Sequence, residues 1–153
     1  MKIIATVVCL LGALCLVGPS VAAEPTNLEN FVRGFNYETR KEMKCSGKEL
    51  LSLLSKNEAV LVDIRFPEEQ QAWGTQFALN IPLNELPKRL QELPKDKIIV
   101  TACPHDDRSN IAMVYLRTQG YNARYLVDGL VGFGELLRGD TARDFMASLN
   151  KKK

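Results

Sequence analysis

The residues best suited to chemistry form one short polar loop, 103–108, with the sequence CPHDDR. Its first residue, Cys103, follows the apolar run 98–102, and a helical pattern begins just after the loop, at about residue 109. The N–H groups of such a strand-to-helix loop, and the positive end of the following helix dipole, stabilise an anion. Arg108 adds a full positive charge. We therefore expect Cys103 to be a reactive thiolate nucleophile.

The other charged side chains of the loop have to be reconciled with that thiolate. Asp106 and Asp107 would oppose an anion if they faced the sulfur, so we expect them to point outward or to cap local N–H groups at the helix start. His105 is the only histidine in the sequence. A general base is one interpretation of it, and a surface residue is the one we favour. No second His or Cys stands at ligand spacing, so we expect no metal.

Short apolar runs alternate with helical patterns along most of the chain. The expected strands are 59–64, 98–102 and 123–127, and the expected helices are 48–56, 83–93, 109–119 and 142–150. Strands that are apolar throughout belong to parallel sheets with both faces covered. The sequence therefore predicts an α/β fold with a central parallel sheet and helices on both faces. Sites in such folds form outside the carboxyl ends of the strands, which is the position of Cys103.

One globular domain accounts for most of the chain. Its 153 residues are 46% hydrophobic and 25% charged, which is ordinary for a single domain with a core of useful size. We expect this domain over 44–139, preceded by a mixed extension at 24–43 and followed by a C-terminal helix and lysine tail at 140–153. No internal repeat or low-complexity linker indicates a second domain.

The first 23 residues are typical of a secretory signal sequence. Lys2 is followed by an apolar stretch, a Gly-Pro-Ser break and small residues at 21–23. We expect cleavage after Ala23, export, and a periplasmic location if the source has two membranes. The alternative is an uncleaved membrane anchor, because 3–23 carries no charge and has about the length that spans a bilayer. Membrane association is expected only in that case.

Charge and cysteine content restrict the function classes further. The sequence has 20 basic and 18 acidic residues, and removing Lys2 with the signal leaves a net charge of about +1. Nucleic-acid binding would show a larger basic excess, so we expect no such partner. Cleavage would leave two cysteines, Cys45 and Cys103. A disulfide between them is one alternative in an oxidising compartment, but we expect Cys45 to pack as a small hydrophobe before a helix.

Several spaced motifs together resemble the rhodanese (thiosulfate sulfurtransferase-like) family. They read Asp63-Ile64-Arg65, Pro67-Glu68-Glu69, Asn80-Ile81-Pro82, Cys103 through Arg108-Ser109, and Leu126-Val127-Asp128-Gly129. The resemblance spans about 44–139. It rests on the agreement of all the motifs, because none of them is specific alone.

The resemblance implies a two-step sulfur transfer without a cofactor. Cys103 would take sulfane sulfur from a polysulfide, a persulfide or thiosulfate, hold it as a persulfide, and pass it to a thiol or cyanide; a protein persulfide is a further candidate partner. Arg108 would hold the anion or orient the loop. Asp63 and Arg65 would support the site, in the simplest case as a buried ion pair at a strand end. The loop backbone would bind the sulfur through Pro104, His105, Asp106, Asp107 and Ser109.

Two departures from the family pattern bear on the substrate. The stretch 73–78 differs in chemistry from the run that usually precedes the Asn-Ile-Pro segment, and Asp106 stands where a glycine is usual. A loop with two acids is also poorly matched to dianionic thiosulfate. This favours a persulfide or polysulfide as the donor.

Two other functions remain as alternatives. Cys-based phosphatases and arsenate reductases have five residues between the cysteine and the arginine, which enclose a tetrahedral oxyanion. Only four residues separate Cys103 from Arg108 here, which favours sulfur over phosphate. The second alternative is a rhodanese-like binding module that docks a partner without turning over small molecules. The intact cysteine and arginine argue against an inactive domain.

Overall fold

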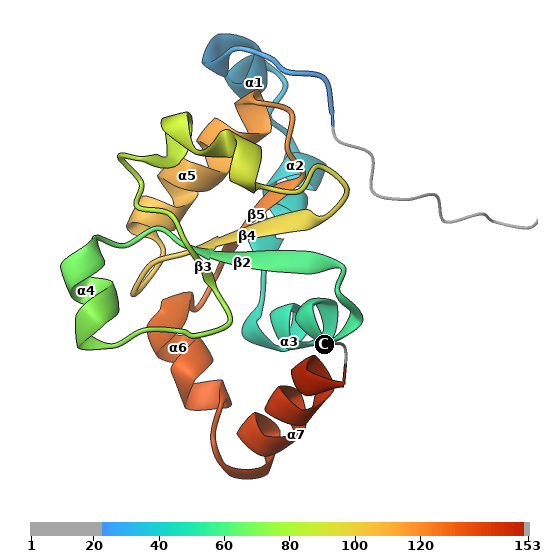
Figure 1. The fold of residues 1–153 in the computed structure, drawn as a ribbon. Helices are drawn as coiled ribbons and strands as arrows, with labels where there is room; N and C mark the ends of the chain where they lie inside the picture. Colours follow the sequence, from blue (N-terminus) through green and yellow to red (C-terminus); the bar gives the residue numbers. More distant parts are fainter. Residues whose placement is uncertain (1–22, 152–153) are drawn as a thin grey trace, which may run out of the picture.

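Five parallel strands form a single central sheet in a computed structural model that describes residues 23–151 (Figure 1). The strand order is β1-β5-β4-β2-β3, so β4 lies in the middle, between β5 and β2. Every residue of β4 is buried, as expected for a strand covered on both sides. The predicted α/β fold with a parallel sheet is confirmed.

The secondary structure elements have the following bounds. The strands are β1 (Lys44–Cys45), β2 (Ala59–Asp63), β3 (Leu79–Asn80), β4 (Ile98–Ala102) and β5 (Ala123–Leu126). The α-helices are α1 (Leu28–Arg33), α2 (Tyr37–Glu42), α3 (Gly47–Lys56), α4 (Pro67–Ala72), α5 (Asp107–Thr118), α6 (Gly129–Leu136) and α7 (Gly139–Asn150). Two 3-10 turns, η1 (Leu86–Lys88) and η2 (Leu90–Glu92), precede β4.

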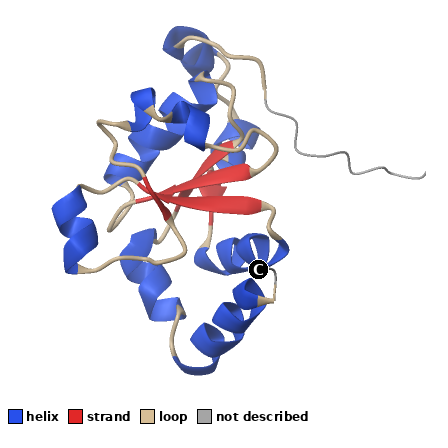
Figure 2. Cartoon of the chain, in the orientation of Figure 1, coloured by secondary structure: helices blue, strands red, loops and turns tan. Residues whose placement is uncertain are grey.

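Helices cover both faces of the sheet (Figure 2). Side chains alternate between the two faces along a strand, so Leu61 and Val100 enter one apolar cluster, while Val62 and Ile99 enter the other. The first cluster is closed by α3, α6 and α7, and the second by α5 and η1. The predicted arrangement of helices on both faces is therefore present.

The helix predicted over 83–93 is wrong. Two separate 3-10 turns occupy this stretch, in which Arg89 N–H donates to the Leu86 carbonyl at 3.2 Å, three residues earlier. Pro87 explains the difference, because it has no N–H to donate to the carbonyl of Leu83 one turn before it. The pattern of apolar residues alone does not reveal this missing backbone hydrogen bond.

The helix predicted over 109–119 begins two residues earlier, at Asp107. Asp107 and Arg108 are therefore the first residues of α5 and not members of a loop. The last helix likewise begins at Gly139, ahead of the predicted start at residue 142. Short elements α4 and β3 lie in the stretch after β2, for which the apolar pattern predicts neither a helix nor a strand.

The N-terminal extension and the C-terminal helix pack on other elements of the domain, α1 on α5 and α2 on β1. The extension at 24–43 contains α1 and α2, and α7 packs on α3 with Phe145 buried. The predicted signal sequence, 1–23, lies outside the described residues except for Ala23. Within residues 23–151, none of the helices has the length and apolar character needed to cross a membrane.

Candidate active site

Cys103 directly follows β4, the central strand, at the carboxyl edge of the sheet. The register places Ala102, the last residue of β4, beside Asp63, the last residue of β2. The segments that leave these two strands therefore start next to each other. Because ligand sites of open parallel sheets form at this edge, Cys103 occupies the position expected of a functional residue.

The N-terminus of α6 fixes the path of the Cys103 loop. Leu130 N–H donates to the carbonyl of Cys103 at 2.8 Å, and Val131 N–H donates to the carbonyl of Pro104 at 3.2 Å. The peptide group is planar, so the N–H of His105 must point the opposite way from the Pro104 carbonyl, away from α6. The loop is thus held by its carbonyls, which leaves this N–H for another acceptor.

Gly129 makes this close approach possible. Its φ is +59°, a left-handed conformation that glycine adopts without strain. A Cβ at this position would lie 2.2 Å from the carbonyl oxygen of His105 and 2.3 Å from that of Pro104. Any other residue would force the loop and α6 apart.

The carboxylate of Asp107 faces the Cys103 sulfur. The thiol Sγ donates a hydrogen bond to Asp107 Oδ1 over 3.3 Å. The N–H of Arg108 and then the Cys103 thiol lower the pKa of Asp107, so this side chain is ionised at neutral pH. Asp107 does bind a local N–H group, as predicted, but the expectation that it avoids the sulfur is wrong. The reason is the early start of α5, whose first side chain reaches back over the preceding loop.

Cys103 and Asp107 differ sharply in exposure. Cys103 is 0% exposed, whereas Asp107 is an exposed residue. The contact between them therefore joins a buried sulfur to a carboxylate at the protein surface. A reagent that approaches the sulfur along this contact meets the carboxylate first.

Arg108 is engaged with α4 through Glu69. Its Nη1 and Nη2 donate to the two carboxylate oxygens of Glu69 at 2.6 and 2.9 Å. Phe66 N–H also donates to Glu69 Oε2, at 3.2 Å. The Arg108 hydrogen bonds lower the pKa of Glu69 to about 2. The pair connects α4 to α5, and the charge of Arg108 is balanced by a carboxylate.

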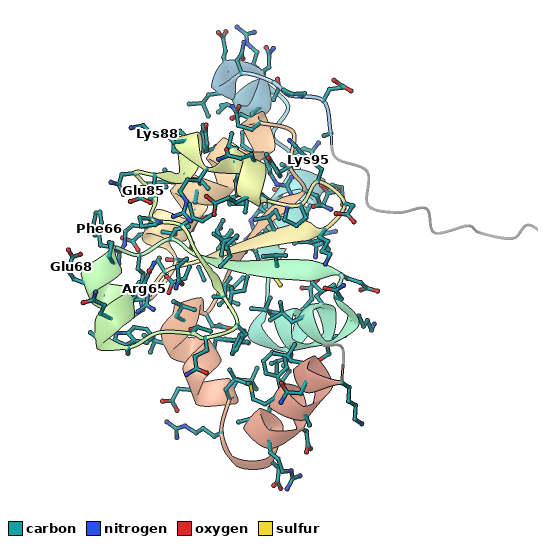
Figure 3. The ribbon with its side chains drawn as sticks, in the orientation of Figure 1. Arg65, Phe66, Glu68, Glu85, Lys88 and Lys95 are labelled. Atoms are coloured by element: carbon teal, nitrogen blue, oxygen red, sulfur yellow. The ribbon has the colours of Figure 1, made fainter. Side chains whose placement is uncertain are left out.

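Asp63 and Arg65 form a buried ion pair at the end of β2, as expected. Both side chains are 0% exposed, and Arg65 Nη2 lies 2.6 Å from Asp63 Oδ2. The guanidinium carbon lies 3.9 Å from the centre of the Trp73 ring, and Nη2 donates to the Trp73 carbonyl at 2.9 Å. Figure 3 shows Arg65 between α4 and the sheet, while Phe66 and Glu68 point outward. The pair anchors the segment after α4.

The remaining predicted residues form the edge and base of the loop. His105 and Asp106 are exposed, Pro104 is half-buried and Ser109 is buried. Ser109 Oγ donates to the Asp106 carbonyl at 3.0 Å, and Thr101 Oγ1 donates to the Ser109 carbonyl at 2.9 Å. His105 thus has the exposure of a surface residue. Over residues 23–151, no group of three or more His, Cys, Asp or Glu side chains could hold a metal ion.

Cys45 lies in the other apolar cluster, on the opposite face of the sheet from Cys103. Both cysteines are free thiols, so the alternative of a Cys45–Cys103 disulfide is not seen. Cys45 is fully buried, its Sγ donates to the Ser46 carbonyl at 3.6 Å, and burial raises its pKa to about 12. The prediction that Cys45 packs as a small hydrophobe is confirmed.

Comparison with known proteins gives the family. The sequence model described as the rhodanese-like domain matches residues 46–136, well over half of the chain. The chain belongs to the rhodanese-like domain family. This rhodanese-like domain superposes on the human single-domain sulfurtransferase TSTD1 with a TM-score of 0.56 and 31% identity, covering 61% of this chain and 96% of that one.

Curated relatives match shorter stretches. A sulfurtransferase from Allochromatium vinosum is 39% identical over 69 residues, which cover 45% of this chain and 64% of that protein, somewhat less than two thirds. The thiosulfate sulfurtransferase GlpE of Pseudomonas syringae pv. syringae is 31% identical over 88 residues, which cover 58% of this chain and 83% of that protein. The sulfurtransferase activities in these two names are those of the relatives.

For two residues that shape the site, the sequence indicates a place in a motif but not their contacts with the Cys103 loop or with Arg108. Glu69 stands in the Pro-Glu-Glu motif at a helix start, but nothing in the sequence pairs it with Arg108, 39 residues later. Gly129 stands just after β5, where a glycine suggests a turn. Its close contact with the Cys103 loop depends on how β4 and β5 lie side by side, which no local pattern reveals.

Proposed function

We propose that this rhodanese-like domain is a sulfurtransferase or sulfur carrier in which Cys103 accepts a sulfane sulfur as a persulfide. The observation that carries the proposal is the position of Cys103: it follows the central strand and begins a loop that α6 holds by two hydrogen bonds. The relatives named as sulfurtransferases support the same reaction class.

The proposed reaction has two steps. In the first, the Cys103 sulfur attacks the outer sulfur of the donor, a new S–S bond forms, and the donor's own bond to that sulfur breaks. The electron pair of the broken bond leaves with the donor, as sulfite from thiosulfate or as a thiol from a persulfide. In the second step, a thiol or cyanide attacks the outer sulfur of the persulfide and restores Cys103. The sulfur is passed on without another oxidant or reductant.

The loop would support these steps with its backbone. A persulfide extends one atom beyond Sγ and carries negative charge, which N–H groups at the start of a helix stabilise. The N–H of His105, which points away from α6, is available for this role. Asp63 and Arg65 would act indirectly, by holding the end of β2 beside the loop.

The engagement of Arg108 argues against the phosphatase and arsenate reductase alternative. In such enzymes, the arginine of the loop has to bind the oxygens of a tetrahedral oxyanion. Here both terminal nitrogens of Arg108 bind Glu69, at 2.6 and 2.9 Å. An arginine that is already paired to a carboxylate serves to orient the loop and α4. Sulfur transfer is compatible with this role, because it does not require the arginine to bind a tetrahedral oxyanion.

We further propose that the mature protein acts outside the cytoplasm, after cleavage of the signal predicted at 1–23. Its partners would then be small sulfur donors and thiol acceptors of that compartment, including a protein persulfide. A fusion of the first 30 or so residues to an export-dependent reporter tests the localisation. Reporter activity is the expected result, and retention of the fusion in the cytoplasm would exclude it.

Turnover with a small donor and acceptor tests the function. Purified protein is incubated with methanethiosulfonate or thiosulfate as donor and cyanide as acceptor, and thiocyanate is measured over time. A Cys103→Ser variant is the blank, and a Cys45→Ala variant is the matched control for removing a thiol. We expect thiocyanate to form with the wild type and with Cys45→Ala only.

The outcomes separate the three roles still open to this domain. Continuous thiocyanate formation identifies a transferase. Formation of a stable Cys103 persulfide that reacts only slowly with cyanide identifies a carrier. If no donor loads sulfur onto Cys103, the proposed function is wrong and a binding module becomes the better account.

A further inference from the structure

The charge next to the Cys103 sulfur has the sign opposite to that expected for a site that binds anions. The carboxylate oxygen of Asp107 lies 3.3 Å from Sγ. Asp107 is exposed while Cys103 is 0% exposed, so this carboxylate stands on the solvent side of the sulfur. A sulfur donor that reaches Sγ along this contact must pass close to a fixed negative charge.

Arg108 offsets that charge only in part, because its guanidinium also binds a carboxylate of its own. Arg108 binds both oxygens of Glu69, and Arg65 is fully buried against Asp63. The residue that precedes Asp107, Asp106, is exposed and adds a second negative charge. Each arginine thus has a carboxylate of its own, and the exposed carboxylates of Asp106 and Asp107 leave the approach to the sulfur acidic on balance.

We propose that Asp107 determines donor specificity, by selecting sulfane-sulfur donors that carry at most one negative charge over dianionic thiosulfate. The inference rests on the proposed function of Cys103 and adds the residue that chooses its substrate. Repulsion between charges scales with their product, so a dianion is penalised twice as much as a monoanion at the same distance. Persulfides and thiosulfonates, with one charge or none, belong to the preferred class.

Two donors differ by this one charge and undergo the same chemistry. Thiosulfate and the Cys103 thiol give the persulfide and sulfite; methanethiosulfonate and the thiol give the same persulfide and methanesulfinate. In both reactions Sγ forms a bond to the sulfane sulfur, the bond from that sulfur to the sulfonyl sulfur breaks, and its electron pair leaves with the product. The thiol proton ends on the persulfide. No co-reactant is needed.

The test compares loading rates of Cys103 from the two donors, followed as a gain of about 32 Da by intact-mass spectrometry. In Asp107→Asn the amide oxygen can still accept the thiol hydrogen bond, but the charge is gone. We expect the rate ratio of thiosulfate to methanethiosulfonate to rise about tenfold, since the carboxylate is exposed and partly screened. A ratio within about twofold of the wild type, with both donors loading, would overturn the inference.

Asp106→Asn is the matched control, because it removes an exposed negative charge from the residue next to Asp107 without touching the sulfur. It should change the ratio by less than Asp107→Asn. An equal change would show that the general charge of the loop matters and that Asp107 has no special place, which overturns the assignment.

Alkylation separates a failure of this inference from a failure of the proposed function. Iodoacetamide is neutral and iodoacetate is an anion of similar size, and neither requires sulfur transfer. If Asp107 filters charge, the rate of iodoacetate relative to iodoacetamide at Cys103 rises about tenfold in Asp107→Asn. An unchanged ratio overturns the inference even if no donor loads sulfur. A raised ratio without sulfur loading shows that Asp107 filters charge at Cys103 but that the proposed function is wrong.

Discussion

Cys45 and Cys103 are both fully buried, but they lie on opposite faces of the sheet and in different surroundings. Cys45 is enclosed by apolar side chains, its Sγ donates a hydrogen bond to the Ser46 carbonyl, and burial raises its pKa to about 12. Cys103 instead begins a loop and donates to the exposed carboxylate of Asp107. Burial of the residue therefore does not separate a structural cysteine from a chemical one. The polar groups around the sulfur do.

The largest expected effect comes from removing each thiol in turn. Cys103→Ser should lower the rate of sulfur transfer by about a thousandfold or more, because the hydroxyl is a far weaker nucleophile at neutral pH. Cys45→Ala should keep the rate within about twofold and reduce the free energy of unfolding by about 1 kcal/mol, through the small cavity it leaves. Thiocyanate assays and denaturant unfolding measure the two effects. Equal losses of activity would erase the proposed difference between the cysteines.

The next effect comes from the glycine that shapes only the Cys103 side. Gly129→Ala adds a Cβ 2.2 Å from a backbone oxygen at a φ of +59°, so we expect a loss of about 3 kcal/mol in unfolding free energy or a displaced loop with little activity. Gly134→Ala is the control in the same helix, where a Cβ would meet nothing within 4 Å. It should be neutral or slightly stabilising. Similar behaviour of both variants, in unfolding and in activity, would contradict the account of the loop.

Alkaline pH should reveal the apolar surroundings of Cys45. Its pKa rises from 9.0 to about 12 on folding, so the contribution to stability is complete below pH 9 and is lost as pH rises through 12. Between these values the unfolded thiol ionises and the folded one does not. We expect the wild type to lose about 1 kcal/mol of unfolding free energy per pH unit more than Cys45→Ala does. Parallel curves for the two proteins above pH 9 would show that Cys45 is not desolvated.

The smallest effect concerns the ion pair beside the Cys103 loop. The pKa of Glu69 falls from 4.5 to about 2, so its contribution is present above pH 4.5 and is lost as pH falls toward 2. The Glu69 side chain is 33% exposed, which limits the contribution to less than about 1 kcal/mol. Glu69→Gln should lower stability at pH 7 by that amount and flatten the acid limb of the stability curve. Glu68→Gln, its exposed neighbour on α4, should leave the curve unchanged.

Much of the fold could be predicted because its strands are simple. Buried parallel strands are apolar along their whole length, so the runs that became β2, β4 and β5 could be read within a residue or two of their ends. The predicted helix over 83–93 failed because the apolar spacing of its leucines outweighed Pro87, which removes a helical hydrogen bond. The hydrophobic pattern describes side chains only, whereas the missing hydrogen bond that prevents this helix belongs to the backbone.

The candidate site divides in the same way. The position of Cys103 after a strand is a local property and could be predicted, as could the ion pair between Asp63 and Arg65, two residues apart. The orientation of Asp107 could not, because it depends on whether α5 begins at residue 107 or 109. The pairing of Arg108 with Glu69 could not either, since it depends on where α4 lies relative to α5.

Intact-mass spectrometry of the mature protein after incubation with methanethiosulfonate or a polysulfide tests the central claim most directly. We predict a gain of about 32 Da on the wild type and on Cys45→Ala, which a reducing agent reverses and Cys103→Ser lacks. The same gain on Cys103→Ser, or no gain on the wild type with any donor, would contradict the account of Cys103 as the sulfur-accepting residue.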